Sequence, residues 1–149
     1  MKILRFAALG ILAAALPLSA GQITKKYDLK TVKGIQALNL ETDAIRVNQI
    51  EFSDEVSSPN LFSKGGMKAT VRVDNNSPDD FEVGIAVVFF DEAGNIVAAG
   101  AGGTKVGFLK KGARDTHSID FDYVFRNAKN AKTFTVTLET KAKEAAPKK

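Results

Sequence analysis

The stretch EVGIAVVFFDEAGNIVAA, residues 82–99, decides the fold expected for this chain of 149 residues. Residues 82–90 carry apolar side chains at odd and even positions, which is typical of a central strand covered on both faces. Residues 91–95 (DEAGN) form a short polar loop with glycine in fourth place, which suits a type I turn followed by a left-handed residue. Residues 96–99 then return as an antiparallel strand. The stretch therefore predicts a β-hairpin with Gly94 at positive φ.

Strand signals continue on both sides of this hairpin. Residues 67–74 (MKATVRVD) and the segment around 119–125 (IDFDYVF) alternate apolar and polar side chains, the pattern of half-buried strands with one wet face. Weaker strand signals cover residues 35–42, 44–52 and 134–138, and a change of parity between Val47 and Ile50 predicts a bulge. Five inward positions predict the core: Val71, Val87, Phe89, Phe121 and Val136.

Loops and turns separate these strands at short intervals. Loop composition covers residues 53–65, and DNNSPDD, residues 74–80, is a turn. Residues 127–132 (NAKNAK) suit one helical turn. About seven or eight short strands without a long helix predict an all-β chain, specifically an immunoglobulin-like antiparallel β-sandwich.

The amino-terminal residues predict export. Lys2 and Arg5 precede an apolar run, residues 6–16, and a small-residue exit ends at Ala20. This is the layout of a secretory signal peptide, and the run is short for a membrane-spanning helix. We therefore expect a bacterial protein that is periplasmic or secreted after cleavage near Ala20, and that is not embedded in a membrane.

The remaining residues divide into three parts. Residues 21–34 are expected to be a polar lead-in, residues 35–140 the β-sandwich domain, and residues 141–149 a disordered basic tail. The formal net charge of +4 resides in the ends: the signal contributes +2 and the tail +3, which leaves −1 for residues 21–140. The absence of a basic body argues against nucleic-acid binding.

Two segments carry a resemblance to a known family. In residues 87–91 (VVFFD) an apolar and aromatic run ends in Asp, and a glycine turn and the strand 96–98 (IVA) follow. Residues 71–83 (VRVDNNSPDDFEV) place Asn and a polar turn after a strand, and residues 109–112 (LKKG) place Leu and Gly before one. This layout resembles the FxLYD-type domains of exported bacterial proteins and, more loosely, other immunoglobulin-like sandwiches.

The resemblance covers roughly residues 66–138. Val87 stands where the family motif has Phe, while Phe89 and Phe90 replace its Leu and Tyr. The resemblance implies a non-catalytic module, and it supplies no binding residues that could be carried over.

The sequence contains few residues that could form a catalytic site. His117 is the only histidine, and we expect it on the surface, because its neighbours Ser118 and Asp115 cannot form a triad with it along one strand. One His and no Cys cannot build a nitrogen–sulfur metal site. Asp120 and Asp122 share a strand face at about 6–7 Å. They could serve a small hydrolase, but the wet face of a strand explains them first.

Two further patterns bear on ligands. The acidic turns Asp79-Asp80 and Asp91-Glu92 could hold Ca²⁺ weakly or bind a small ligand, although no EF-hand spacing is present. The glycine-rich residues 98–107 lack a phosphate-binding pattern. We expect Gly102, Gly103, Thr104 and Lys105 to form a mobile ligand-binding rim, because loops on a rigid scaffold commonly carry binding.

These observations predict an exported accessory protein that works without a cofactor. The expected partners are another envelope protein or a polysaccharide. No residue is assigned a catalytic or metal-binding role.

Overall fold

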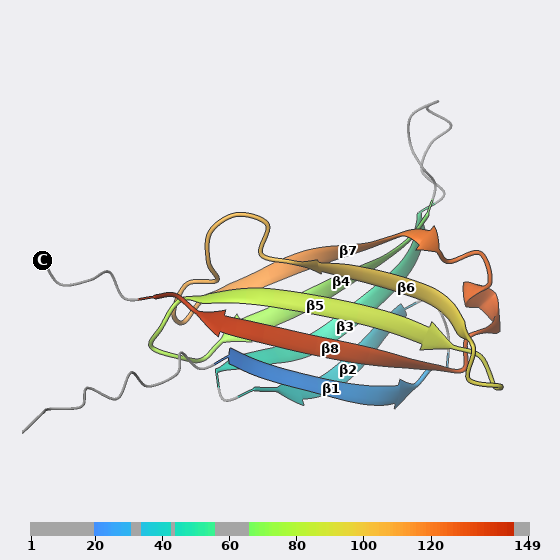
Figure 1. Cartoon of the computed structure of the whole chain (residues 1–149), viewed down its shortest axis with the longest axis horizontal. Helices are drawn as coiled ribbons and strands as arrows, with labels where there is room; N and C mark the ends of the chain where they lie inside the picture. Colours follow the sequence, from blue (N-terminus) through green and yellow to red (C-terminus); the bar gives the residue numbers. More distant parts are fainter. Residues whose placement is uncertain (1–19, 31–33, 43, 56–65, 145–149) are drawn as a thin grey trace, which may run out of the picture.

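The computed structural model describes residues 20–30, 34–42, 44–55 and 66–144. Within these residues the chain forms eight β-strands, one short 3-10 turn (η1, Ala128–Asn130) and no α-helix, so the predicted all-β class is confirmed (Figure 1). No helix in the described part of the chain is long and apolar enough to cross a membrane. The strands are β1 (Ala20–Asp28), β2 (Gly34–Glu41), β3 (Ile45–Glu55), β4 (Gly66–Asn75), β5 (Phe81–Phe90), β6 (Ile96–Gly103), β7 (Arg114–Val124) and β8 (Thr133–Ala142).

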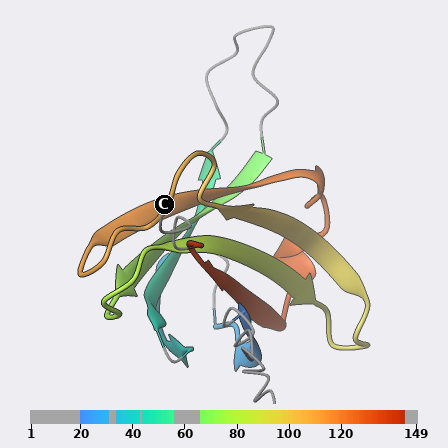
Figure 2. The same ribbon diagram turned by 60° about the vertical axis from the view of Figure 1, so that its left-hand side comes forward.

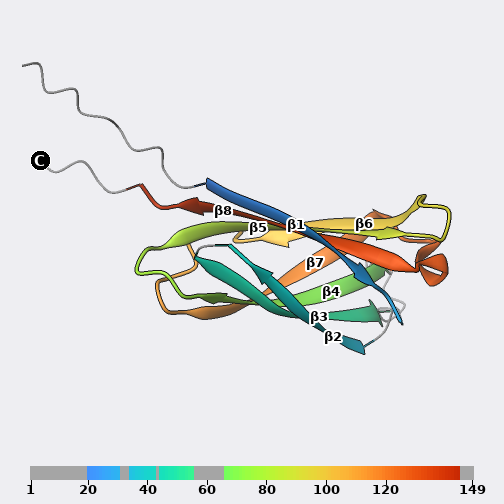
Figure 3. The same ribbon diagram turned by 90° about the horizontal axis from the view of Figure 1, so that it is seen from below.

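All eight strands belong to one antiparallel sheet with the order β1-β8-β5-β6-β7-β4-β3-β2. The sheet curls over, so that the half made of β1, β8, β5 and β6 covers the half made of β7, β4, β3 and β2 (Figure 3). The terminal strands β1 and β2 approach one another along the open side, which we call the seam (Figure 2). There the ammonium Nζ of Lys25 in β1 donates a hydrogen bond to the carbonyl of Asn39 in β2, at 3.2 Å.

The core lies between the two halves of the sheet. Phe52 of β3 packs edge-on against Phe89 of β5, with ring centroids 4.9 Å apart, and against Phe134 of β8 at 5.2 Å. The predicted core is confirmed, because all five of its residues have an exposed fraction of 0%: Val71, Val87, Phe89, Phe121 and Val136. Aromatic pairs in this geometry add to the stabilisation that burial provides.

The predicted hairpin joins β5 to β6. Gly94 has φ of 84°, as expected, and the Asp91 amide donates to the carbonyl of Asn95 at 3.0 Å. The Asp91 carboxylate in turn accepts from the backbone and side-chain nitrogens of Asn95 at 2.8 and 3.0 Å. The turn is thus closed by its own residues.

The predicted bulge and helical turn are also present. The register of β3 against β4 shifts between Val47 and Gln49, which leaves Asn48 as the extra residue. The side-chain amide Nδ2 of Asn48 donates a hydrogen bond to the carboxylate of Asp74 on the neighbouring strand β4. Residues 128–130 form η1, inside the segment expected to turn.

Three boundaries differ from expectation. The lead-in 21–34 contains β1, which pairs with β8 without a break from Ala20↔Lys141 to Asp28↔Thr133. The tail begins later than predicted, because Lys141 and Ala142 still belong to β8. Strand β3 runs to Glu55, so the first three residues of the predicted loop 53–65 belong to it. The proposed signal residues 1–19, the loop residues 56–65 and the tail residues 145–149 lie outside the described residues.

Strand β6 also runs further than the sequence predicts. It continues past the predicted strand 96–99 to Gly103, so Gly100, Gly102 and Gly103 lie within the strand. A Cβ at Gly102 would lie 2.6 Å from the carbonyl oxygen of Ser118, so the absence of a side chain allows β6 to approach β7 closely. The two strands pair only near Ala99↔Val124 and Ala101↔Asp120, and the sheet turns from one half to the other at this junction.

Candidate functional site

The predicted rim residues occupy two different kinds of position. Gly102 and Gly103 lie in β6. Gly103 has a φ of 147°, and a Cβ added at this position would lie only 2.0 Å from the Val83 carbonyl oxygen. The amide of Thr104 donates to the same carbonyl at 2.9 Å, and the Val83 amide donates to the Thr104 hydroxyl at 3.0 Å. The first three rim residues therefore fasten β6 to β5. Lys105 lies in the loop that follows β6, and it is exposed.

This loop, residues 104–108, arches away from the sheet between β6 and β7 (Figure 1, the golden arch above β5). Its far end is fastened as firmly as its start, because Leu109 and Phe81 exchange backbone hydrogen bonds of 2.7 and 3.0 Å. Between these anchors Val106 is 96% exposed. Phe108 is half-buried, and the ammonium of Lys143 lies 5.2 Å from the centre of its ring.

A buried asparagine strengthens the base of the 104–108 loop. The side-chain amide of Asn75 donates to the carbonyls of Asp79 and Leu109, at 2.8 and 3.0 Å, and its oxygen accepts from the Ser77 amide at 2.9 Å. These bonds tie the turn between β4 and β5 to the end of the loop. Asn75 heads a formal glycosylation sequon, but its amide is fully engaged inside the fold.

Hollows flank the loop on both sides. One of about 340 Å³ lies over β5 and β8, where the charged residues Glu82, Glu139, Lys105 and Lys141 surround it. Another, of about 330 Å³, lies toward β7 and is lined on the loop side by residues 103–106 and Phe108, and on the β7 side by residues 115–118. The loop therefore presents an exposed apolar tip between two recesses with polar rims.

His117 lies in the second hollow, and the expectation that it is a surface residue is wrong. It is 6% exposed, because β7 begins at Arg114 and places His117 on the same inward face as Ile119 and Phe121. Its Nε2 is buried and makes no hydrogen bond with the described residues. Burial lowers the pKa of His117, while the Asp115 carboxylate and the Gly103 carbonyl oppose that shift. If the period-2 alternation of residues 119–125 is extended two residues back from Ile119, it predicts that His117 faces inward.

Asp120 and Asp122 share the outer face of β7, as predicted. Phe121 between them is fully buried, whereas Asp120 is half-buried and Asp122 exposed. Neither residue lines the two hollows that flank the 104–108 loop.

The acidic turns use their oxygens for structure. The Asp80 carboxylate accepts from the Lys110 ammonium at 2.9 Å and from the Lys111 amide at 3.1 Å, and these bonds lower its pKa. Hydrogen bonds from Asn95 likewise lower the pKa of Asp91. Among the described residues no cluster of three or more potential metal ligands occurs. The turns are thus closed by protein donors.

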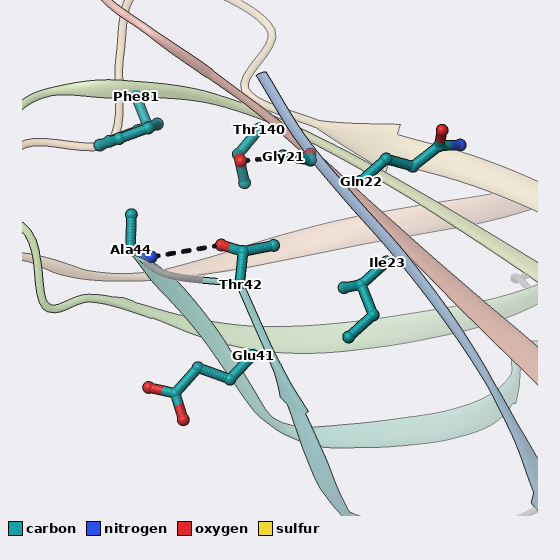
Figure 4. A pocket seen from close by; sticks show the side chains of 8 residues that line it. All are labelled: Gly21, Gln22, Ile23, Glu41, Thr42, Ala44, Phe81 and Thr140. Carbon is teal, nitrogen blue, oxygen red and sulfur yellow. Dashed lines mark hydrogen bonds between the residues drawn. The ribbon is translucent and has the colours of Figure 1, made fainter. Parts of the chain in front are cut away.

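A separate hollow of about 260 Å³ lies in the seam between β1 and the turn that joins β2 to β3 (Figure 4). The hydroxyls at its wall are engaged: Thr140 donates to the Gly21 carbonyl at 3.3 Å, and Thr42 accepts from the Ile45 amide at 3.1 Å. No sequence pattern predicts this hollow, because it depends on β1, a segment expected to be a polar lead-in.

Comparison with known proteins adds no family to this description. The chain matches no protein-family model, and it matches no curated protein.

Proposed function

We propose that this chain is an exported, non-catalytic binding module of a bacterial envelope, built on an immunoglobulin-like sandwich, and that the 104–108 loop contacts its partner. One observation carries the proposal. The loop is fastened to β5 at both ends and still presents Val106 with 96% of its surface exposed, between two recesses.

This arrangement suits recognition energetically. A loop whose ends are already ordered loses less conformational freedom on binding than a free segment does. An exposed valine provides apolar area for the centre of a contact, and the polar rims provide partners for hydrogen bonds and ion pairs around it.

The charges around the loop favour a protein as the partner. Lys105 and Lys141 line one hollow together with Glu82 and Glu139, so that neither sign of charge dominates. A mixed rim of this kind complements another folded surface and gives specificity through matched charges. Another envelope protein fits it better than a uniformly charged polymer does.

Two features support the non-catalytic part of the proposal. The single histidine is 6% exposed and its Nε2 is enclosed, so the ring presents no accessible Nε2 to the hollow that it lines. Its sequence neighbour Ser118 is exposed, on the opposite side of the same strand. Ser118 and His117 therefore do not form a pair of nucleophile and base on β7.

Site-specific photo-crosslinking in the native host tests the contact. A photoreactive residue at position 106 is expected to give a discrete crosslinked protein, whereas one at Val124, 44% exposed at the end of β7, is expected to give none. Equal products from both positions, or no product from position 106, would refute the assignment of the loop.

Export has a separate test. The sequence of residues 1–20 predicts that the mature protein begins at or near Gly21. Mass spectrometry of the protein from its host should show the loss of these residues. An intact chain in the cytoplasm would contradict export without bearing on the loop.

A further inference from the structure

His117 lies beside the start of the 104–108 loop, where strands β6 and β7 separate. The two strands pair no further toward the loop than Ala101↔Asp120, so no residue of β6 is paired with His117. Its ring instead helps to line the hollow of about 330 Å³ that lies between β7 and the loop. The buried ring and the loop therefore border the same space.

A protonated His117 ring would lack an acceptor in this arrangement. Nε2 is enclosed and makes no hydrogen bond with the described residues. In the neutral ring Nε2 can remain without a proton, whereas the imidazolium carries a proton on both nitrogens. A buried, charged donor without a partner is strongly disfavoured. Protonation therefore requires the ring to reach water or another acceptor.

The Asp115 carboxylate can supply that acceptor. It belongs to a residue that lines the same hollow, and it now accepts a hydrogen bond from the Thr116 amide at 2.7 Å. Two lysines stand at the loop: Lys105 lies within it, and the ammonium of Lys143 is 5.2 Å from the centre of the Phe108 ring. Strand β6 has no charged residue. The charged side chains of the other neighbouring strands alternate onto their outer faces: Lys68, Arg72 and Asp74 on β4, Glu82 on β5, and Arg114, Asp120 and Asp122 on β7.

The loop is the wall of the hollow that can give way most easily. Its two ends are hydrogen-bonded to β5, but the backbone of residues 105–108 makes no hydrogen bond with the described residues. On the other side of the hollow, β7 pairs with β4 at every residue from Arg114 to Phe121. A ring that turns into the hollow should therefore displace the loop before it displaces β7.

We propose that His117 is an acid-sensitive latch for the 104–108 loop. The neutral ring keeps its buried place on β7 and the loop stays closed. The protonated ring turns into the hollow toward Asp115 and water, and it loosens the adjacent hydrogen bond between Thr104 and Val83. The inference rests on the proposed contact of this loop only for its consequence: a loosened loop loses more freedom on binding, so the partner should bind less tightly in acid.

The latch should act on the acid side of neutrality. Burial lowers the pKa of His117 below its ordinary 6.5, and the Asp115 carboxylate and the Gly103 carbonyl oppose that shift. The ring is therefore neutral at pH 7, and the loop should loosen only as the pH falls below 6.5.

Nuclear magnetic resonance of the purified protein tests the latch directly. His117 is the only histidine, so its ring signals report its protonation without ambiguity. After correction for the intrinsic effect of pH on exchange, the Thr104 amide should lose about tenfold of its protection between about pH 7 and pH 5, with the midpoint of the His117 titration. The Asp91 amide, bonded to Asn95 at the opposite end of β6, is the control and should lose much less. Equal losses at both amides, or an unchanged Thr104, would overturn the proposal.

Matched variants identify the groups involved. His117→Gln should abolish the pH dependence of the Thr104 amide. Asp115→Asn should move its midpoint to lower pH, whereas Asp122→Asn on the outer face of β7 should leave the midpoint unchanged. Circular dichroism checks that the variants remain folded. A Thr104 profile that persists in His117→Gln would refute the latch. None of these measurements needs a partner, so they can fail while crosslinking at position 106 succeeds, and the reverse.

Discussion

Two glycines with positive φ, Gly94 and Gly103, bracket strand β6 and need glycine for different reasons. At Gly94 φ is 84°, and no atom lies within 4 Å of an added Cβ. At Gly103 φ is 147°, and an added Cβ would lie 2.0 Å from the Val83 carbonyl oxygen. The first constraint arises within a five-residue turn. The second arises from a neighbouring strand about twenty residues earlier in the chain.

This difference divides the fold into locally and remotely determined parts. The turn at Gly94 is closed by hydrogen bonds between Asp91 and Asn95. The segment around Gly103 is held by Val83 of β5 and lies close to β7. The 104–108 loop continues from Gly103, so its position depends on remote contacts. The following variants should separate the two regions.

Phe121→Ala should have the largest effect. Phe121 is fully buried on β7, so its truncation should lower the free energy of unfolding by about 3–5 kcal/mol through lost burial and a cavity. Asp120→Asn on the outer face should change it by no more than about 0.5 kcal/mol. Urea melts measure both, and equal effects would contradict the assignment of the two faces. Amide exchange should also quicken in the 104–108 loop more than in the turn at Gly94.

Gly103→Ala should come next. The added methyl group meets backbone rather than a mobile side chain, and the residue is held at positive φ, so we expect a loss of about 3 kcal/mol. The matched change Gly107→Ala, also at positive φ but with open space around it, should cost about 1–2 kcal/mol. Similar melting curves for the two variants would show that contact with Val83 does not set the requirement.

Gly94→Val should cost about 1–2 kcal/mol, because a β-branched residue is strained at this positive φ even with open space around it. Gly94→Asn should be much milder, since Asn tolerates the left-handed region. Thermal melts of the pair distinguish backbone strain from a loss of flexibility. If the two variants melted alike, the local account of this turn would fail.

Acid should have the smallest of these effects, and it should act at the remote region. Burial lowers the pKa of His117 below its ordinary 6.5, so the unfolded chain takes up its proton more readily than the folded one. The free energy of unfolding should therefore be highest above pH 6.5 and fall as the pH drops below that value. Asp74, Asp80 and Asp91 have lowered pKa values, so their contribution is lost only as the pH falls below 3.8.

The variant His117→Gln isolates this titration. Its stability should vary less between pH 7 and pH 5 than that of the unmodified protein. Parallel pH profiles for the two proteins would show that His117 does not titrate in the way its burial implies.

The sequence predicted those features whose causes lie within a few residues. The period-2 alternation of residues 67–74 and 119–125 identified buried and exposed faces, and the buried positions Val71 and Phe121 followed from it. Prediction from the sequence failed for the edge strand β1, which has few apolar residues. Residues 20–28 are mostly polar, and only their pairing with β8 makes them a strand.

The candidate site was predicted only in part. Composition pointed to residues 102–105, but glycine-rich sequence does not distinguish a mobile rim from a strand that must pass close to its neighbours. In the structure Gly102 and Gly103 belong to β6, and the exposed residues of this segment are Lys105 and Val106 in the loop that follows. Whether a glycine is free or confined depends on remote atoms.

By itself, then, the sequence determined the all-β class, the hairpin at Gly94 and the inward faces of the strands, because periodicity and turn chemistry act over short distances. Only the tertiary structure decided that β1 completes the sheet, that His117 is buried and that the 104–108 loop is fastened at both ends. Each of these depends on strands far apart in the chain meeting in one register, and no short window of residues contains that information.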